Sequence, residues 1–292
     1  MGLRRPQCRI AAMKSPPRLR SLIDEGLIDS VSRQLMSGKE AMVYVVRCGD
    51  ETRCAKVYKD ANERSFRQAV DYTENRKFKN TRQARAMAKG TRYGRQAAEA
   101  AWQSAEVDAL YRLAGAGVRV PKPHNFLDGV LLMELVTDAD GEAAPRLNDV
   151  LFTPEQALEH HASLLTEVVR MLCAGVVHGD LSEFNVLLAA DGPVIIDLPQ
   201  AVDAAGNNHA ERMLLRDVAN LRDFFGRFAP ALLGTNYGPE IWSLYRGGML
   251  QQGSVLSGRF EQRHGPVDLG SVLREIDDAQ DEEQARRMRM SA

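Results

Sequence analysis

Three side chains near the middle of the chain have the types and the spacing that phosphoryl transfer requires. Asp180 and Asn185 lie five positions apart in a segment with apolar flanks, and Asp197 follows the apolar run 194–196. An aspartate can accept the proton of an attacking hydroxyl, and carboxylate and amide oxygens are ligands for a hard cation. Taken singly, each residue is more often a turn residue or a cap. The joint pattern predicts Asp180 as a catalytic base, and Asn185 and Asp197 as metal ligands.

The same chemistry needs a cation on the phosphates, held in place by an acid. Lys56 lies in the run Cys54-Ala55-Lys56-Val57-Tyr58, which predicts a strand, and it precedes the Asp180 segment. A lone lysine in a strand is more often a solvated edge residue, but this order along the chain favours a role at the phosphates. Glu99 and Glu106, in the next predicted helix, are the candidate partners, and the sequence leaves both open.

Residues 36–44 form the candidate phosphate loop. Ser37, Gly38 and Lys39 stand just before a predicted strand, where backbone N–H groups and a hydroxyl can donate to a phosphate. The loop has neither the three glycines of ordinary protein kinases nor a Walker A pattern. A plain turn entering a strand explains these residues equally well.

The elements that must position these side chains form a β-rich first half and an α-rich second half. Two strands over 43–46 and 55–58, joined by a turn at 48–50, predict a small antiparallel sheet, and two more strands are expected within 118–136. Helical spacing of apolar residues is found over 19–35, 96–116, 153–174, 209–228, 238–249 and 267–288. This order predicts an α+β fold of two lobes with a cleft between them.

Composition restricts the class of protein. The 292 residues carry a net charge of −1, with 44% hydrophobic and 26% charged residues, which is typical of a globular protein and gives no overall attraction to nucleic acid or anionic lipid. No apolar run reaches 18 residues and no signal peptide is evident, so we expect no membrane association. The four cysteines lack metal-ligand spacing, which favours a cytoplasmic protein.

With these segments in order, the chain resembles the RIO family of atypical serine/threonine protein kinases. The motifs that carry the resemblance are Ser37-Gly38-Lys39-Glu40-Ala41, Ala55-Lys56-Val57-Tyr58-Lys59, His178-Gly179-Asp180-Leu181-Ser182-Glu183-Phe184-Asn185 and Ile196-Asp197-Leu198-Pro199-Gln200. The resemblance spans about residues 20–250. It implies a protein-kinase-like fold with a small β-rich N-lobe, an α-rich C-lobe and ATP in the cleft, with Mg²⁺, or Mn²⁺ in its place.

The resemblance also implies roles for particular residues. Glu106 becomes the preferred partner of Lys56, and Asp197 becomes an acceptor of a transient phosphate in addition to a metal ligand. The run Met133, Glu134, Leu135 and Val136 becomes the hinge, which reads adenine through the backbone of Glu134 and Val136. Pro145 lies beside the adenine, and Ser37 and Lys39 contact the phosphates. These positions match the motifs of the family residue by residue.

The chain departs from the family pattern at several places. Met36 stands where the family usually has Ser or Thr, and Gly179 where it often has Ala; both changes look tolerable. Pro199 occupies the position of the glycine in the Asp-Phe-Gly motif of ordinary kinases, and no Ala-Pro-Glu segment is evident. We therefore expect autophosphorylation or ATP hydrolysis rather than broad protein phosphorylation. The length suggests a bacterial member without a winged-helix domain.

We predict residues 1–18 as a disordered basic arm, 19–136 as the N-lobe with a flexible basic insertion at about 60–95, 137–255 as the C-lobe with the catalytic and metal loops, and 256–292 as a helical tail. The insertion carries ten Lys or Arg and two acids over residues 64–95, a local charge of +8. Its candidate phosphorylation sites are Ser65, Thr73, Thr81 and Thr91.

Two other functions fit parts of the sequence. A small-molecule phosphotransferase of the aminoglycoside or choline kinase type shares the His-Gly-Asp-Leu-x-x-x-Asn core. A nucleotide-dependent factor that binds a ribosomal precursor or RNA would use the basic residues 64–95, since clustered Lys and Arg bind phosphate backbones; a solvated loop accounts for them equally well. The sequence indicates neither the physiological substrate nor the oligomeric state.

Overall fold

A computed structural model of the chain describes residues 16–38, 40–59 and 92–260. The chain divides into two compact units, residues 1–259 and 260–292, and the first contains nearly all of the described residues. The predicted arm up to residue 15, residues 60–91 of the predicted basic insertion with its four candidate phosphorylation sites, and the predicted helix at 267–288 lie outside the described residues.

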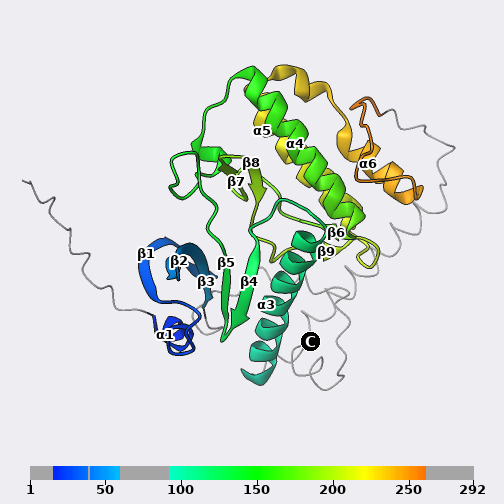
Figure 1. The fold of residues 1–292 in the computed structure, drawn as a ribbon. Coiled ribbons are helices and arrows are strands. Elements are labelled where there is room, and N and C mark those ends of the chain that lie inside the picture. Colours follow the sequence, from blue (N-terminus) through cyan, green and yellow to red (C-terminus); the bar gives the residue numbers. More distant parts are fainter. Residues whose placement is uncertain (1–15, 39, 60–91, 261–292) are drawn as a thin grey trace, which may run out of the picture. The chain divides into compact units, whose positions relative to one another are not determined.

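An antiparallel sheet of five strands forms the first half of this unit (Figure 1). Its strands are β1 (Ser30–Ser37), β2 (Ala41–Cys48), β3 (Glu51–Tyr58), β4 (Pro123–Leu127) and β5 (Val130–Glu134), in the spatial order β1-β2-β3-β5-β4. The turn between β4 and β5 consists of Asp128 and Gly129, both in the left-handed region with φ of 49° and 71°. An Asp-Gly pair suits this conformation, because its twist matches the twist of the flanking strands. The strands predicted around 43–46, 55–58 and within 118–136 are confirmed.

The predicted helix at 19–35 is wrong beyond its first turns. The observed helix α1 (Pro17–Asp24) is short, and the chain then passes Gly26, at φ 68°, into strand β1. The apolar spacing that looked like one helix serves two elements, because residues of α1 and of the segment after it pack on the same face of the sheet. This cluster contains Leu19, Leu22, Ile28, Val46 and Val57. Since Pro17 and Arg18 lie in α1, the predicted arm also ends earlier than residue 18.

The second half of the unit is mostly helical. Its helices are α4 (Pro154–Cys173), α5 (Ala210–Gly226) and α6 (Tyr237–Arg246), with short 3-10 turns η2 (Leu147–Asp149) and η3 (Pro230–Gly234). Two small two-stranded sheets follow α4 in the sequence and precede α5. They pair β6 (Val176–Val177) with β9 (Val202–Asp203), and β7 (Val186–Ala189) with β8 (Gly192–Ile195). Helices α4 and α5 lie side by side (Figure 1). The helices predicted at 153–174, 209–228 and 238–249 are confirmed.

One long helix, α3 (Arg92–Gly115), links the two halves and confirms the helix predicted at 96–116. Leu110 and Leu113 of α3 belong to one buried cluster that includes Tyr58 and Leu131 of the sheet and Leu164 of α4. The sheet-bearing lobe and the helical lobe therefore share a continuous core, and the α+β two-lobed fold is confirmed. None of the helices in the described ranges combines the length and apolarity that a bilayer crossing demands.

Helix α4 begins at a reciprocal cap. The Thr153 hydroxyl accepts the N–H of Gln156 (3.2 Å), and the Gln156 side chain accepts the N–H of Thr153 (3.0 Å). These two bonds satisfy donors that the first turn of a helix leaves unpaired. The cap therefore fixes the residue at which α4 begins, and α4 packs against α5.

Replacing Thr153 by alanine removes this cap. We expect Thr153→Ala to lower the free energy of unfolding by about 1 kcal/mol, measured by urea denaturation. Thr166→Ala is the matched control, because Thr166 is exposed in the middle of α4 and its hydroxyl only bonds back to Ala162. If both variants lost the same free energy of unfolding, the cap would not be the source of the stabilisation.

Candidate active site

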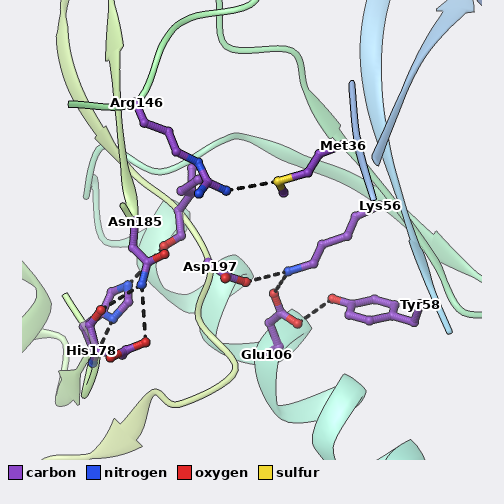
Figure 2. Close-up of polar contacts among 10 residues, drawn as sticks. Met36, Lys56, Tyr58, Glu106, Arg146, His178, Asn185 and Asp197 are labelled. Atoms are coloured by element: carbon purple, nitrogen blue, oxygen red, sulfur yellow. Dashed lines mark hydrogen bonds and ion pairs between the residues drawn. The ribbon is translucent and has the colours of Figure 1, made fainter. Parts of the chain in front are cut away.

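Lys56 is shared by two carboxylates that come from distant parts of the chain. Its Nζ donates to Glu106 Oε1 of α3 (2.5 Å) and to Asp197 Oδ1, which follows β8 (2.9 Å; Figure 2). The Lys56 side chain is 12% exposed and that of Glu106 only 4%. Burial acts to lower the pKa of Lys56, but Glu106 and Asp197 outweigh it and hold this pKa well above its ordinary value. The amine is therefore cationic at any physiological pH.

Tyr58, two residues after Lys56 on β3, holds the other oxygen of Glu106. Its hydroxyl donates to Glu106 Oε2 at 2.8 Å, and burial keeps the pKa of Tyr58 above its ordinary value, so it remains a donor. The sequence left Glu99 and Glu106 open as partners of Lys56, and the structure brings Glu106 to it. The side chain of Glu99 lies outside the described part. The contact with Tyr58 was not predicted, although the alternation of β3 places Lys56 and Tyr58 on one face.

Asp197 has a backbone conformation that is rare for a residue with a side chain. Its φ is 66°, in the left-handed region, where strain is kept only if the surroundings enforce it. The N–H of the preceding Ile196 donates to the Asn185 carbonyl (3.0 Å). This bond joins the segment after β8 to the loop that contains Asp180 and Asn185. Partial burial acts to raise the pKa of Asp197, but the charge of Lys56 outweighs it, so the net pKa is lowered. An ionised carboxylate, 44% exposed, thus faces the cleft.

The loop with Asp180 and Asn185 is held by side chains of its own. The Asn185 amide donates to the Asp180 carbonyl (2.8 Å), which leaves the Asn185 oxygen for a cation. His178 is buried, and burial lowers its pKa, so the ring is neutral. Its Nε2 bonds the Ile196 carbonyl (3.1 Å), and its Nδ1 accepts the Asp180 N–H (3.3 Å; Figure 2). His178 therefore ties the catalytic loop to the segment that leads from β8 to Asp197.

The donor set suits a hard cation that retains other ligands. Asn185 and Asp197 supply one amide and one carboxylate, and Mg²⁺ is commonly bound by one or two carboxylates together with phosphates and water. Within the described ranges no group of three or more His, Cys, Asp or Glu side chains could hold a metal alone. Asn185 and Asp197 therefore fit part of the ligand set of such a cation.

Asp217, on α5, fixes the backbone on both sides of Asp180. Its carboxylate accepts the N–H groups of Gly179 (2.8 Å) and Leu181 (3.0 Å), and the neighbouring Arg216 donates to the Gly179 carbonyl. Asp217 is 1% exposed, and burial raises its pKa to about 7, although the two N–H donors act to lower it. Sequence reasoning missed this residue; the signal was an aspartate on the apolar face of a predicted helix.

Gly179 meets a steric requirement as well. Its φ is 82°, and a Cβ at this position would lie 2.7 Å from the Gln200 carbonyl oxygen. A side chain here would both strain the backbone and push the segment after Asp197 away. The departure from alanine noted in the sequence is thus required by the backbone.

The predicted hinge, residues 133–136, begins in the last two residues of β5 and continues past its end. The Glu134 side chain pairs with the Arg119 guanidinium through two bonds (3.0 and 3.1 Å) and accepts the Lys122 N–H (3.0 Å). The Val136 carbonyl accepts the Ala144 N–H (3.0 Å), and no partner for the Val136 N–H is found in the described part of the chain. The Glu134 carboxylate is therefore occupied with holding the hinge, and Val136 retains a backbone donor for a ligand.

Met133, the first residue of the predicted hinge, lines a small pocket. The pocket of about 30 Å³, room for roughly one water, lies between Met133, Lys56 and Ile196. Of the remaining predicted nucleotide contacts, Ser37 ends β1, the Pro145 carbonyl accepts the Leu188 N–H (2.8 Å), and Leu135 is half-buried. Lys39 lies outside the described residues. The neighbouring Gly38 accepts from Lys59 Nζ (2.7 Å).

The comparisons with known proteins agree on one family. A sequence model of the RIO domain matches residues 42–236. The RIO-type serine/threonine-protein kinase Rio1 of Haloferax volcanii is 38% identical over 210 residues, which cover 70% of this chain and 67% of that protein. RIO1 of Homo sapiens is 30% identical over 226 residues, covering 73% of this chain and 36% of that protein.

The serine/threonine-protein kinase RIO3 of Caenorhabditis elegans is 31% identical over 221 residues, covering 73% of this chain and 40% of that protein. The matched part is thus well under half of these two eukaryotic relatives. A crystal structure of a kinase domain is 15% identical and covers 71% of this chain and 65% of its own, with a TM-score of 0.41, a likeness too weak to carry an argument.

The burial of Asp217 predicts a pH-dependent mutational effect. Asp217→Asn retains the shape but replaces one acceptor oxygen by an NH₂ group, which leaves a buried N–H unpaired at a cost of about 1–3 kcal/mol. Because the folded-state pKa of Asp217 is about 7, above the ordinary value, protonation of Asp217 favours folding. The advantage of Asp217 over asparagine is therefore fullest near pH 4 and declines as pH rises to 7, by at most about 1.4 kcal/mol per unit.

Urea denaturation of both proteins at pH 5 and pH 7.5 measures this difference. Asp223→Asn is the control, since Asp223 lies on the same helix but is exposed, and Arg222 is its ion-pair partner among the described residues. A penalty for Asp217→Asn that grows with pH would contradict the assignment.

Proposed function

The chain belongs to the RIO family, and on that premise we propose that it is an atypical serine/threonine kinase that transfers the γ-phosphate of ATP. The observation that carries the proposal is the position of Lys56 between Glu106 and Asp197 (Figure 2). Ile196, next to Asp197, bonds the Asn185 carbonyl, and Asn185 in turn bonds the Asp180 carbonyl. A buried, oriented ammonium, an ionised carboxylate and an amide oxygen supply the positioning and charge that phosphoryl transfer needs.

These side chains divide the tasks of the reaction, and Asp197 has two of them. Lys56 holds phosphate oxygens, and Glu106, itself fixed by Tyr58, keeps the ammonium in place. Asn185 and Asp197 would hold Mg²⁺, or Mn²⁺, which neutralises charge on the phosphates when bound. The adenine is read by backbone groups at Glu134 and Val136.

Asp180 accepts the proton of the attacking hydroxyl. It lies on a loop whose backbone is fixed on both sides by Asp217, so its carboxylate is positioned before the substrate arrives. The acceptor we propose is a serine or threonine of the chain itself, and water when none is in place. Asp197 is a second, transient acceptor: Lys56 bonds its Oδ1, which leaves Oδ2 as the nucleophile.

Nucleotide-dependent binding to RNA or a ribosomal precursor is a second proposed function. The local charge of +8 over residues 64–95 favours it, because basic clusters bind phosphate backbones and release counterions. We expect association with RNA to weaken steeply as salt rises, and to weaken about tenfold or more when Arg76, Lys77 and Lys79 become glutamine. Binding titrations at 50 and 200 mM salt test this; salt-independent binding would exclude the cluster.

Substitutions of the two aspartates test the catalytic proposal. With γ-labelled ATP and Mg²⁺, we expect Asp180→Ala to lower label transfer and phosphate release at least about 100-fold while ATP binding remains, because only proton transfer and orientation are lost. Asp197→Asn should lower both turnover and metal-dependent ATP binding, because it removes the charged metal ligand.

Asp149→Asn, at an exposed position on η2, is the control and should keep full activity. Turnover in Asp180→Ala equal to the unaltered chain would refute the assignment of the base. Efficient phosphorylation of an aminoglycoside or of choline would favour the small-molecule alternative.

A further inference from the structure

Arg146 occupies the edge of the nucleotide cleft, at a point that neither the sequence motifs nor the catalytic proposal accounts for. It precedes η2, and its backbone forms a β-bridge with Leu187, two residues after Asn185. Its guanidinium turns toward Met36, the residue before Ser37 at the end of β1 (Figure 2). Arg146 therefore spans from the strand beside the catalytic loop to the candidate phosphate loop.

The charge of Arg146 is poorly compensated. Its contact in the described part of the chain is to Met36 Sδ (3.1 Å), and a thioether is a weak acceptor. No carboxylate among the described residues forms an ion pair with Arg146. Arg33, which also crosses between the lobes, differs in this respect, because it pairs with Glu142 at 3.1 Å. The Arg146 guanidinium is thus free to exchange a weak acceptor for a strong one.

The cleft needs a further cation for a polyphosphate. Lys56 is the cation nearest the metal ligand Asp197, but it is already shared with Glu106, so the three groups together carry one excess negative charge. A guanidinium fork also matches the geometry of phosphate oxygens, which it binds through two parallel N–H bonds.

We propose that Arg146 is a phosphate-binding residue of the nucleotide site. Its guanidinium leaves Met36 Sδ when a nucleotide enters and donates to phosphate oxygens on the side of the cleft opposite Lys56. The inference rests on the proposed function, because it assumes that ATP occupies this cleft. It adds a phosphate-binding residue that is not part of the family motifs. Met36 is then the residue that the Arg146 guanidinium contacts when no nucleotide is bound.

The test separates recognition of phosphate from recognition of the nucleoside. Calorimetric titration without divalent metal measures the dissociation constants of ATP, ADP and adenosine for the unaltered chain, Arg146→Met and Arg146→Lys. Methionine keeps a long apolar stem that can still pack on Met36, and lysine keeps the charge without the fork. Arg33→Met is the matched control, since Arg33 is exposed and already paired.

We expect Arg146→Met to bind ATP and ADP at least about tenfold more weakly, the loss of a charged hydrogen bond, and adenosine within twofold of the unaltered chain. Arg146→Lys should recover part of the ATP affinity, and Arg33→Met all of it. Unchanged ATP affinity in Arg146→Met, or an equal loss for adenosine and ATP, would overturn the assignment alone. Failure of the unaltered chain to bind ATP would overturn the proposed function with it.

Discussion

The ammonium of Lys56, held between Glu106 and Asp197, is the interaction on which the rest of the site depends. It joins β3, α3 and the segment after β8, three parts of the chain that are separated by 50 and 91 positions in sequence. Buried ion pairs are costly to leave half-made, because removing one partner strands the charge of the other. The docking of α3 on the sheet, the orientation of Tyr58 and the placement of the Asp197 carboxylate are thus coupled through one side chain.

A second set of contacts fixes the opposite side of the cleft. His178 and Asp217 bind the backbone around Asp180 from two directions, and Asn185 closes the same loop. The left-handed conformation of Asp197 persists because these neighbours enforce it. These contacts therefore hold the backbone around Asp180 and Asp197 in place before any ligand is present. Polar groups that are fixed in advance can lower a reaction barrier electrostatically.

The sequence predicted what is local and missed what is assembled from a distance. Asp180, Asn185 and Asp197 lie in one contiguous stretch of chain, and the bonds Asn185–Asp180 and Ile196–Asn185 link them, while their catalytic and metal-binding roles stay predictions. The helix at 19–35 failed because apolar residues at helical spacing were divided between α1 and β1 by Gly26. The choice between Glu99 and Glu106 is a matter of helix docking, which spacing along the chain does not determine.

Asp217 and Arg146 were missed for a related reason, since their partners lie about 36 and 110 positions away. The burial of Asp217 and the weak thioether contact of Arg146 are recognisable only once their surroundings are known. Conversely, Gly179 shows that the structure can explain a departure from a family pattern: the close approach of the Gln200 carbonyl leaves no room for a Cβ.

The most direct test of the account is the rate at which Lys56→Met releases the γ-phosphate of ATP, compared with the unaltered chain and with Lys122→Met, a change at an exposed lysine. We expect Lys56→Met to remain folded by circular dichroism but to turn over ATP at least about 100-fold more slowly. Lys122→Met should turn over ATP at the rate of the unaltered chain. Turnover by folded Lys56→Met at the rate of the unaltered chain would contradict the central role given to the shared ammonium.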